Sequence, residues 1–378
     1  MTVFMEKISE NLNEIEPFNY LFAAIRGIQA GREYYIAMCP LRIIPKIFFF
    51  NEEEEIPPEL RAQRVLNQAR IPEITNYMIE NNTEYVFSSL TASIDGRVQF
   101  KPYGESGLDN KMGMLIVPMT ARFIINDGQH RRAAIEEALK IRPDLGFETI
   151  SVVFYIDAGL KKAQQMFADL NQHAVRPTRS LGILYNKRDS CSRLALDLAN
   201  NVSIFKGLTD FEKSSISNRS IKMFTLSGIY QATIELLGKN KKDSEITESE
   251  KKLAEEYWTE VSKNIPEWNL LIQRKVSSNE LRKEYVHAHG IALHSLGIVG
   301  HSLMEKYPDD WKKQLNKLRN VDWSRSNTKI WEGRAMIGGR INKSRVNLIL
   351  TTNILKQMFG LELTSEENEI ENEFVKNG

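Results

Sequence analysis

The short run at residues 127–132 holds the side chains of this sequence whose types and spacing are best suited to chemistry. Its members are Asp127, Gly128, Gln129, His130, Arg131 and Arg132. The apolar stretch 122–125 before it predicts a strand, and residues 131–140 predict a helix. A strand that turns through Asp-Gly into a helix presents backbone N–H groups and the positive end of the helix dipole. The run therefore predicts a pocket for an anion, with phosphate as the leading candidate.

An ordinary tight turn is the alternative interpretation of the same run. Asp127 would then cap the helix, and the arginines would point into solvent. The two arginines, the histidine and the preceding strand together favour the anion pocket. That hypothesis fails if the corner is occluded and the guanidinium groups of Arg131 and Arg132 are both bound to carboxylates of the chain itself.

A second polar cluster begins at the end of residues 159–170, which predict a helix. Its side chains are Asn171, His173, Arg176 and Arg179. These four residues could form a second wall of the anion pocket. With equal weight, Asn171 and Ser180 could simply cap helices, and the sequence does not show that the two clusters converge.

Basic residues are concentrated between residues 311 and 345. Ten basic side chains stand against Asp322 and Glu332, so ten minus two leaves a local excess of eight positive charges. The ten are Lys312, Lys313, Lys317, Arg319, Arg325, Lys329, Arg334, Arg340, Lys343 and Arg345. A segment of this density suits the phosphate backbone of DNA, and all ten except Lys329 are predicted DNA-binding residues. A solvated, charge-rich surface is an equally good interpretation.

The composition is that of an ordinary globular protein. The 378 residues are 42% hydrophobic and 26% charged, with a net charge of +1, and this length suits about two domains. No apolar run approaches the roughly 20 residues that span a bilayer. Cys39 and Cys191 are too few for a four-thiolate metal site or a disulfide framework. A cytoplasmic location is expected.

A series of histidines in the second half raises a metal hypothesis, and the spacing argues against it. His287, His294 and His301 are seven residues apart. On one helix this spacing separates neighbours by about 10.5 Å. Zinc–nitrogen bonds are about 2 Å long, so these side chains cannot share one ion. No metal site is predicted.

The order of the predicted elements gives an α+β fold. Residues 1–180 predict strands mixed with helices, and residues 181–378 predict a mainly helical domain that contains the basic segment. Two hairpins are predicted in the first domain, one over 20–28 and 32–38, the other over 85–94 and 97–101 around Asp95-Gly96. In the second domain, helices are predicted over 181–200, 221–237, 254–263, 281–306 and 343–359, with a polar loop over 239–252.

The Asp-Gly-Gln-His-Arg signature at residues 127–131 resembles that of the DGQHR-domain family. The segment Phe167–Val175, with Pro177 and Ser180 and a chain of this length, is similar to one group of that family, DndB. The resemblance covers most of the chain. It implies a DNA-binding transcriptional repressor of a bacterial DNA phosphorothioation (sulfur-modification) operon, with no part in the sulfur transfer step itself.

The DGQHR-domain family is in turn similar to the ParB/sulfiredoxin fold, in which an element at a strand–helix junction binds nucleotide phosphate. This resemblance implies that Gly128, His130 and Arg131 are the matching positions. Gln129 stands where sulfiredoxin has its reactive cysteine, so sulfiredoxin chemistry is not implied. A ParB/sulfiredoxin-like first domain is therefore expected.

The leading hypothesis is a regulator that binds double-stranded promoter DNA through the basic segment. Residues 127–132 would bind phosphate, either from a nucleotide such as ATP or from DNA. Further candidate partners are the DNA phosphorothioation enzymes and a second copy of the chain, whereas a membrane is not expected. The rival hypothesis is an enzyme, a nucleotide hydrolase or a DNA nickase. In that case His130 acts as acid or base, and Asp127 orients it or holds Mg²⁺. A pure assembly module is the third hypothesis.

Overall fold

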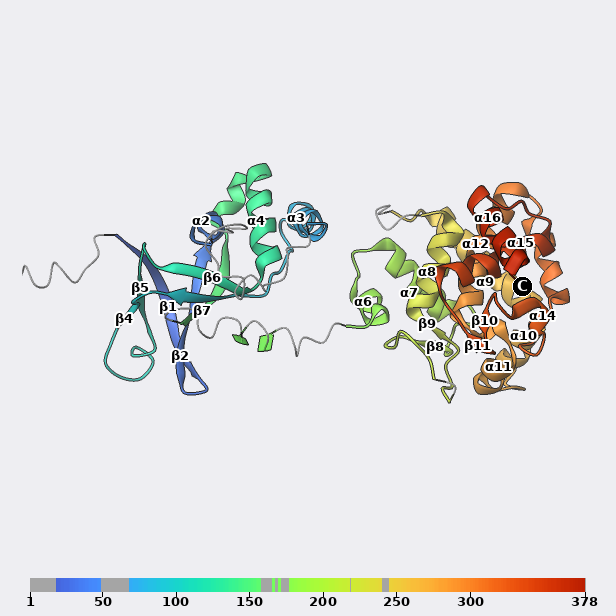
Figure 1. The fold of residues 1–378 in the computed structure, drawn as a ribbon, viewed down its shortest axis with the longest axis horizontal. Helices are drawn as coiled ribbons and strands as arrows, with labels where there is room; N and C mark the ends of the chain where they lie inside the picture. Colours follow the sequence, from blue (N-terminus) through green and yellow to red (C-terminus); the bar gives the residue numbers. More distant parts are fainter. Residues whose placement is uncertain are drawn as a thin grey trace, which may run out of the picture. The chain divides into compact units, whose positions relative to one another are not determined.

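The computed structural model of the chain divides into two compact units, Met1–Val175 and Arg176–Gly378. It describes residues 18–48, 68–157, 165–166, 169–170, 177–217, 219–239 and 245–377. The first unit holds the main sheet, and the second consists almost entirely of helices (Figure 1). The predicted mixture of helices and strands is thereby confirmed. The helix predicted over 159–170 lies largely outside the described residues.

A seven-stranded mixed sheet forms the centre of the first unit, in the order β4-β5-β1-β2-β7-β3-β6. Neighbouring strands are antiparallel except for β3 and β7, which are parallel. The strands are β1 (Asn19–Gln29), β2 (Arg32–Pro40), β3 (Leu90–Asp95), β4 (Gln99–Pro102), β5 (Met112–Pro118), β6 (Arg122–Asp127) and β7 (Thr149–Ile156).

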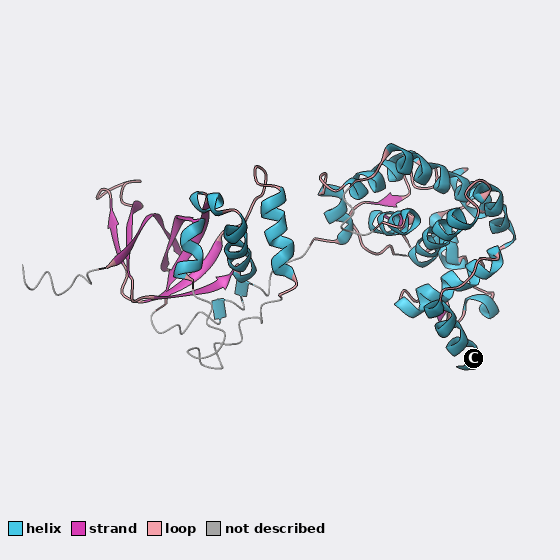
Figure 2. Cartoon of the chain, turned by 90° about the horizontal axis from the view of Figure 1, so that it is seen from above, coloured by secondary structure: helices cyan, strands magenta, loops and turns pink. Residues whose placement is uncertain are grey.

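Helices cover one face of this sheet because alternate strand residues are apolar. Leu90, Ala92 and Ile94 of β3 are fully buried, and Val152 and Phe154 of β7 lie in the same cluster. A period of two places such residues on one face. Helices lie against the sheet of the first unit (Figure 2). Side chains from α2 (Ile44–Ile47), α3 (Arg70–Glu80) and α4 (Gln129–Ile141) complete this core.

The local signals around the first hairpin and around β6 and α4 predicted the structure well. The hairpin of β1 and β2 is confirmed, as are the strand that begins at Arg122 and the helix that follows it. The second predicted hairpin is wrong, because β3 pairs with β6 and β7 while β4 pairs with β5. Gly96 lacks the positive φ that a two-residue hairpin turn needs, and burial of β3 inside the sheet outweighs the local Asp-Gly signal.

Helices build the second unit around a core rich in tryptophan, which includes Trp258, Trp268 and Trp331. They are α6 (Arg179–Tyr185), α7 (Ser190–Asn201), α8 (Leu226–Leu237), α9 (Glu248–Asn264), α10 (Pro266–Ile272), α11 (Ser278–Glu284), α12 (Gly290–Lys306), α13 (Trp311–Gln314), α14 (Thr328–Trp331), α15 (Arg345–Phe359) and α16 (Ser365–Asn377). Short strand pairs join them, β8 (Thr209–Asp210) with β9 (Phe224–Thr225), and β10 (Met336–Ile337) with β11 (Arg340–Ile341). No helix in the described ranges is at once long enough and apolar enough to cross a membrane.

Several helix boundaries in this unit differ from the predicted ones because capping side chains start new helices. The stretch 181–200 is two helices, since the Asp189 carboxylate accepts from the N–H groups of Cys191 and Ser192. The predicted loop 239–252 contains the start of α9, where Thr247 and Glu250 form a capping box. The stretch predicted as one helix over 281–306 is α11, a short 3₁₀ turn and α12.

Three long helices of this unit, α8, α12 and α15, run parallel. Gly297 of α12 lies against the Ala232 carbonyl of α8, and Gly300 lies one turn further along, against Leu236. On the other side of α12, Thr352 of α15 donates to Ser295 over 3.1 Å. At the end of α12, the Lys306 ammonium donates to the carbonyl of Gly360, the C-cap of α15. In both helix pairs the residue numbers therefore rise together, so the positive ends of the three helix dipoles lie on the same side.

Two buried histidines precede α12 and make the stability of this unit sensitive to acid. His289 lies 2.9 Å from the Arg282 carbonyl, and its burial, followed by the nearby Arg282 charge, lowers its pKa to about 3. Burial also lowers the pKa of His287. An unfolded histidine has a pKa of about 6.5, so between about pH 6.5 and about pH 3 the folded state binds fewer protons at His289.

We therefore expect the free energy of unfolding to fall as the pH is lowered through this window. Where His289 is protonated in the unfolded state and neutral in the folded state, each pH unit lowers the free energy of unfolding by up to about 1.4 kcal/mol. Urea unfolding of the wild type and of His289→Gln across a pH series measures the effect, and the variant should show a shallower dependence. His301→Gln, at a partly exposed position, is the matched control. Equal slopes in wild type and His289→Gln would contradict the assignment.

Candidate functional site

The Asp-Gly corner lies where β6 ends and α4 begins, as predicted. Gly128 has φ of 103° and precedes the first turn of the 13-residue α4. A Cβ added there would overlap Leu90 and would lie 2.9 Å from Nη2 of Arg131. A glycine is required here for two reasons, the left-handed backbone and the guanidinium group that lies over it.

Arg131 folds back over this glycine and ties α4 to the sheet. Its Nη2 donates to the Asp127 carboxylate over 2.7 Å and lies 3.3 Å from the Ser89 carbonyl. Its Nη1 donates to the Ser88 hydroxyl over 2.5 Å. The side chains of Arg131 and Asp127 remain 21% and 48% exposed, so the ion pair is open to solvent on one side.

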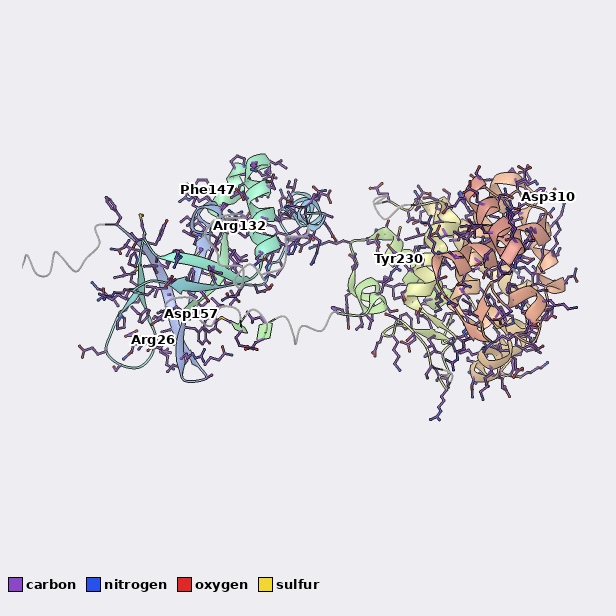
Figure 3. All side chains as sticks on the ribbon, viewed as in Figure 1. Arg26, Arg132, Phe147, Asp157, Tyr230 and Asp310 are labelled. Carbon is purple, nitrogen blue, oxygen red and sulfur yellow. The ribbon has the colours of Figure 1, made fainter. Side chains whose placement is uncertain are left out.

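Arg132 faces the interior and does not line the corner. It is labelled in Figure 3, beside α2 and α4. Arg132 is 7% exposed, and its Nε donates to the Phe48 carbonyl over 2.9 Å. Its other nitrogens bind the Pro45 carbonyl and the Glu136 carboxylate. Both guanidinium groups of the motif thus have carboxylate partners, which is one half of the condition that would exclude an anion pocket, but the Asp127–Arg131 pair is not occluded. Arg132 fastens α4 to the segment around α2, and a substitution there is expected to affect folding.

The remaining members of the motif, Gln129 and His130, lie in the first turn of α4. Gln129 is buried, and its amide nitrogen lies 3.4 Å from the Ile125 carbonyl, while His130 is partly exposed. The charges of Asp127 and Arg131 balance, so attraction for an anion comes from the α4 N-terminus. A phosphate that reaches Arg131 must displace Asp127 from it.

The four residues of the predicted second wall have separate outcomes. Asn171, His173 and Arg176 lie outside the described residues. Arg179 is the first residue of α6, in the second unit, where it donates to the Gln231 side chain and lies 5.9 Å from the centre of the Tyr230 ring. It lines a cavity together with Lys343 of the predicted DNA-binding segment.

Part of the basic segment is exposed and only weakly engaged. Lys312, Lys313 and Arg345 have side chains that are 53%, 79% and 78% exposed, and each is paired with an exposed carboxylate. Arg340 is exposed at the start of β11. Exposed ion pairs contribute about 0–1 kcal/mol, so these cations can exchange their partners for phosphates.

Other members of the segment hold the second unit together. Arg334 is 7% exposed and binds both carboxylate oxygens of Glu371, one of them over 2.9 Å. Lys317, Arg319 and Arg325 each donate to another part of the unit: the Phe359 carbonyl, the Asn264 side chain, and the carbonyls of residues 282, 283 and 339, respectively. The segment is therefore not one continuous basic surface. Arg334 is buried and does not belong to the exposed part.

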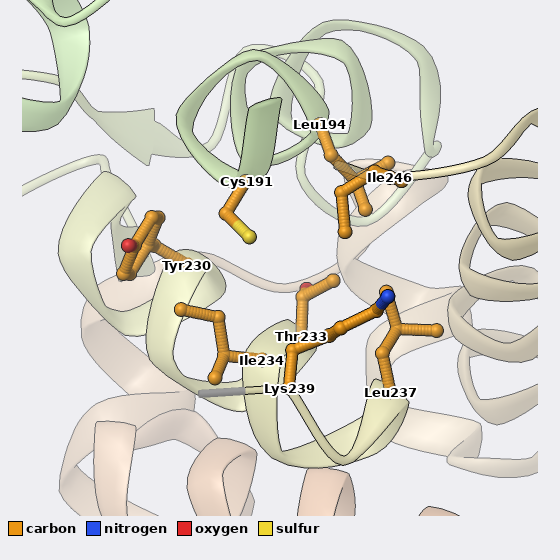
Figure 4. A pocket seen from close by; sticks show the side chains of 8 residues that line it. All are labelled: Cys191, Leu194, Tyr230, Thr233, Ile234, Leu237, Lys239 and Ile246. Atoms are coloured by element: carbon orange, nitrogen blue, oxygen red, sulfur yellow. The ribbon is translucent and has the colours of Figure 1, made fainter. Parts of the chain in front are cut away.

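Cys191 lines a narrow hollow between α7 and α8 (Figure 4). Tyr230, Thr233 and Lys239 also line it, and it leaves essentially no room for a water molecule. Burial raises the pKa of the Cys191 thiol, which makes the reactive thiolate scarce at neutral pH. The hollow is a packing feature of the second unit.

Several residues with evident roles carried no signal in the sequence. Ser88 and Ser89 bind Arg131, although nothing in the residues before β3 singles them out. Arg282 is buried and donates to the carbonyls of residues 216, 223 and 288, but it is one arginine in an ordinary helical stretch. Such partners become visible only when distant segments are brought together.

One known protein family matches nearly the whole chain, across both units. The profile of a family described as DNA-sulfur modification-associated covers residues 22–362. The chain is therefore one of the proteins involved in DNA sulfur-modification systems. Within that class it belongs to the DndB family. No curated protein and no solved structure matches the chain.

The protein should be destabilised by any side chain at Gly128. Gly128→Ala should lower the free energy of unfolding by more than the 1–3 kcal/mol or so of a strained left-handed residue, because its Cβ also overlaps Leu90. Gly107→Ala is the matched control, since Gly107 has φ of 62° with no atom within 4 Å of an added Cβ. Chemical unfolding of both variants measures the difference. Equal losses would show that the overlap at Gly128 is relieved without cost.

Proposed function

We propose that this protein is a DNA-binding transcriptional repressor of a DNA phosphorothioation operon. The observation that carries the proposal is membership of the DndB family over residues 22–362. The exposed cations of the second unit support it, because Lys312, Lys313, Arg340 and Arg345 can reach a phosphate backbone without unfolding. Each phosphate they neutralise releases counterions from DNA.

The first unit, on this proposal, is a ParB/sulfiredoxin-like domain whose corner binds the phosphate of a nucleotide. Its support is the left-handed Gly128, the start of α4 and the Arg131 guanidinium at one point. Binding replaces the Asp127 carboxylate on Arg131 with a phosphate oxygen. The Asp127–Arg131 ion pair is thereby replaced by a pair between Arg131 and the ligand, and Arg131 is the one guanidinium group of the corner that contacts the phosphate.

A nucleotide hydrolase or DNA nickase is the second candidate, and the same corner favours it. The Asp127 side chain is 48% exposed, and His130 lies three residues further on in the first turn of α4. On this alternative His130 moves a proton and Asp127 orients it or holds Mg²⁺. The two candidates differ in what Asp127 does: it competes with the ligand in the first and takes part in turnover in the second.

DNA binding should depend on salt in proportion to the number of phosphates that the protein neutralises. The double variant Arg340→Gln/Arg345→Gln should bind promoter DNA more weakly. The slope of log K against log salt should also be shallower by about 0.9 for each phosphate that the variant no longer neutralises. Fluorescence anisotropy of labelled promoter duplex at several salt concentrations gives both quantities. Lys251→Gln/Lys252→Gln removes the same charge from α9 and should leave the slope unchanged. Identical slopes for the wild type and the two double variants would show that Arg340 and Arg345 do not contact DNA phosphates.

The substitution Asp127→Asn separates the two candidates for the corner. If Asp127 only competes for Arg131, the variant should bind ATP several-fold more tightly, because a neutral amide releases the guanidinium group. If the protein is an ATP hydrolase, phosphate release by the wild type should disappear in the variant. Calorimetric titration with ATP and an assay of released phosphate cover both outcomes. Unchanged affinity without any turnover would exclude the corner from either role.

A further inference from the structure

Two adjoining cavities open at the positive ends of the three parallel helices of the second unit. The larger has a volume of about 170 Å³ and the smaller about 20 Å³, and both are lined by Thr225, Gly228, Gly290 and Lys343. Thr225 caps α8, Gly290 opens α12, and Lys343 precedes the cap of α15. The first turns of helices of 12, 17 and 15 residues therefore meet at one hollow.

The basic side chains around this hollow add to the helix dipoles. The Lys343 ammonium lies 3.2 Å from the position of a Cβ on Gly290, directly at the start of α12. Arg179 lines the larger cavity, and Arg282 lines the smaller. Arg282 is 7% exposed and its buried Nε has no hydrogen-bond partner among the described residues. Burial and the Arg282 charge both lower the pKa of the Lys343 amine.

Negative charge is missing from this end of the helix group. None of the described residues that line the two cavities is acidic, and none of the three helices has an acidic residue in its first turn. The nearest carboxylate along the hydrogen-bond network belongs to Glu235, which binds His294 and Gln231 instead. Lys343 makes no ion pair in the described part of the chain.

The opposite ends of the same helices are compensated. The Lys306 ammonium donates to the Gly360 carbonyl over 2.9 Å, and Lys317 donates to the Phe359 carbonyl over 3.1 Å, both at the end of α15. His301 lies 3.2 Å from the Leu236 carbonyl at the end of α8. Cations at helix C-termini are stabilising, whereas Lys343 at helix N-termini is destabilising unless an anion joins it.

We propose that this cavity binds the phosphate group of a small soluble compound, either inorganic phosphate or the end of a phosphate ester. Hydroxyl groups of Thr225, Ser227 and Ser214 lie in the wall beside the cations and supply further hydrogen-bonding groups. A volume of about 170 Å³ is below the roughly 300–1,000 Å³ of a site for a whole drug-sized ligand, and it suits one phosphate group. The site uses no residue of the first unit and stands independently of the proposed repressor function.

Thermal unfolding and calorimetric titration of the full chain test this site, with inorganic phosphate, AMP and a short DNA duplex as separate probes. Chloride at equal ionic strength is the reference. Phosphate should raise the melting temperature, because a ligand that binds only the folded state stabilises it. Lys343→Gln should bind phosphate about tenfold more weakly, as expected for the removal of a hydrogen bond to a charged group. The same variant without phosphate should melt at the same or a higher temperature, because a repelling charge has been removed.

Arg179→Gln, at an exposed position, gives a second and independent loss of phosphate affinity if Lys343→Gln fails to fold. Lys329→Gln removes an exposed lysine of the same segment and should leave the affinity unchanged. The proposal is overturned if phosphate stabilises no more than chloride does, or if Lys343→Gln and Arg179→Gln retain full affinity. Displacement of phosphate by the duplex, abolished in both variants, would assign the site to DNA phosphates and overturn the small-ligand assignment.

Discussion

The parallel packing of α12 against α8 and α15 is the constraint on which the second unit depends. Gly297 allows α12 to approach the backbone of α8 so closely that a Cβ there would overlap the Ala232 carbonyl oxygen. A Cβ on Gly300 would overlap Leu236 of α8 and Tyr257 of α9. Parallel neighbours align their dipoles, which concentrates positive potential at one end and negative potential at the other. The chain neutralises the negative end with Lys306 and Lys317. It adds further positive charge to the positive end, so the electrostatics of the unit are incomplete without an anion.

The corner in the first unit is organised differently, because its charges are already balanced. Arg131 lies over Gly128 and binds Asp127, and this ion pair joins the start of α4 to the end of β6. The residue types that suggest phosphate binding therefore also serve to hold the strand and helix together. A ligand at the corner must compete with the Asp127 carboxylate, whereas a ligand at the cavity beside Lys343 competes with none among the described residues.

Sequence patterns predicted the structure where the decisive interactions are local. The β1–β2 hairpin follows from a Gly-containing turn, and the β6–α4 corner follows from an Asp-Gly turn after an apolar stretch. The second hairpin was predicted wrongly because β3 is placed by its buried pairing with β6 and β7, which no local signal reveals. The cavity was missed for the same reason. Its walls come from Arg179, Thr225, Gly290 and Lys343, which are far apart in sequence, and their meeting depends on the direction in which distant helices run.

The basic segment shows why a count of charges along the sequence is a poor guide to a binding surface. Arg334 is inside the unit, bound to Glu371, although it belongs to the basic segment 311–345. Lys317 and Lys343 lie near opposite ends of α15, where the same charge has opposite effects on stability. The position of Lys317 is explained by the carbonyl group that it binds. Lys343 has no such partner within the described residues, and for this reason we infer a ligand at Lys343 and a structural role for Lys317.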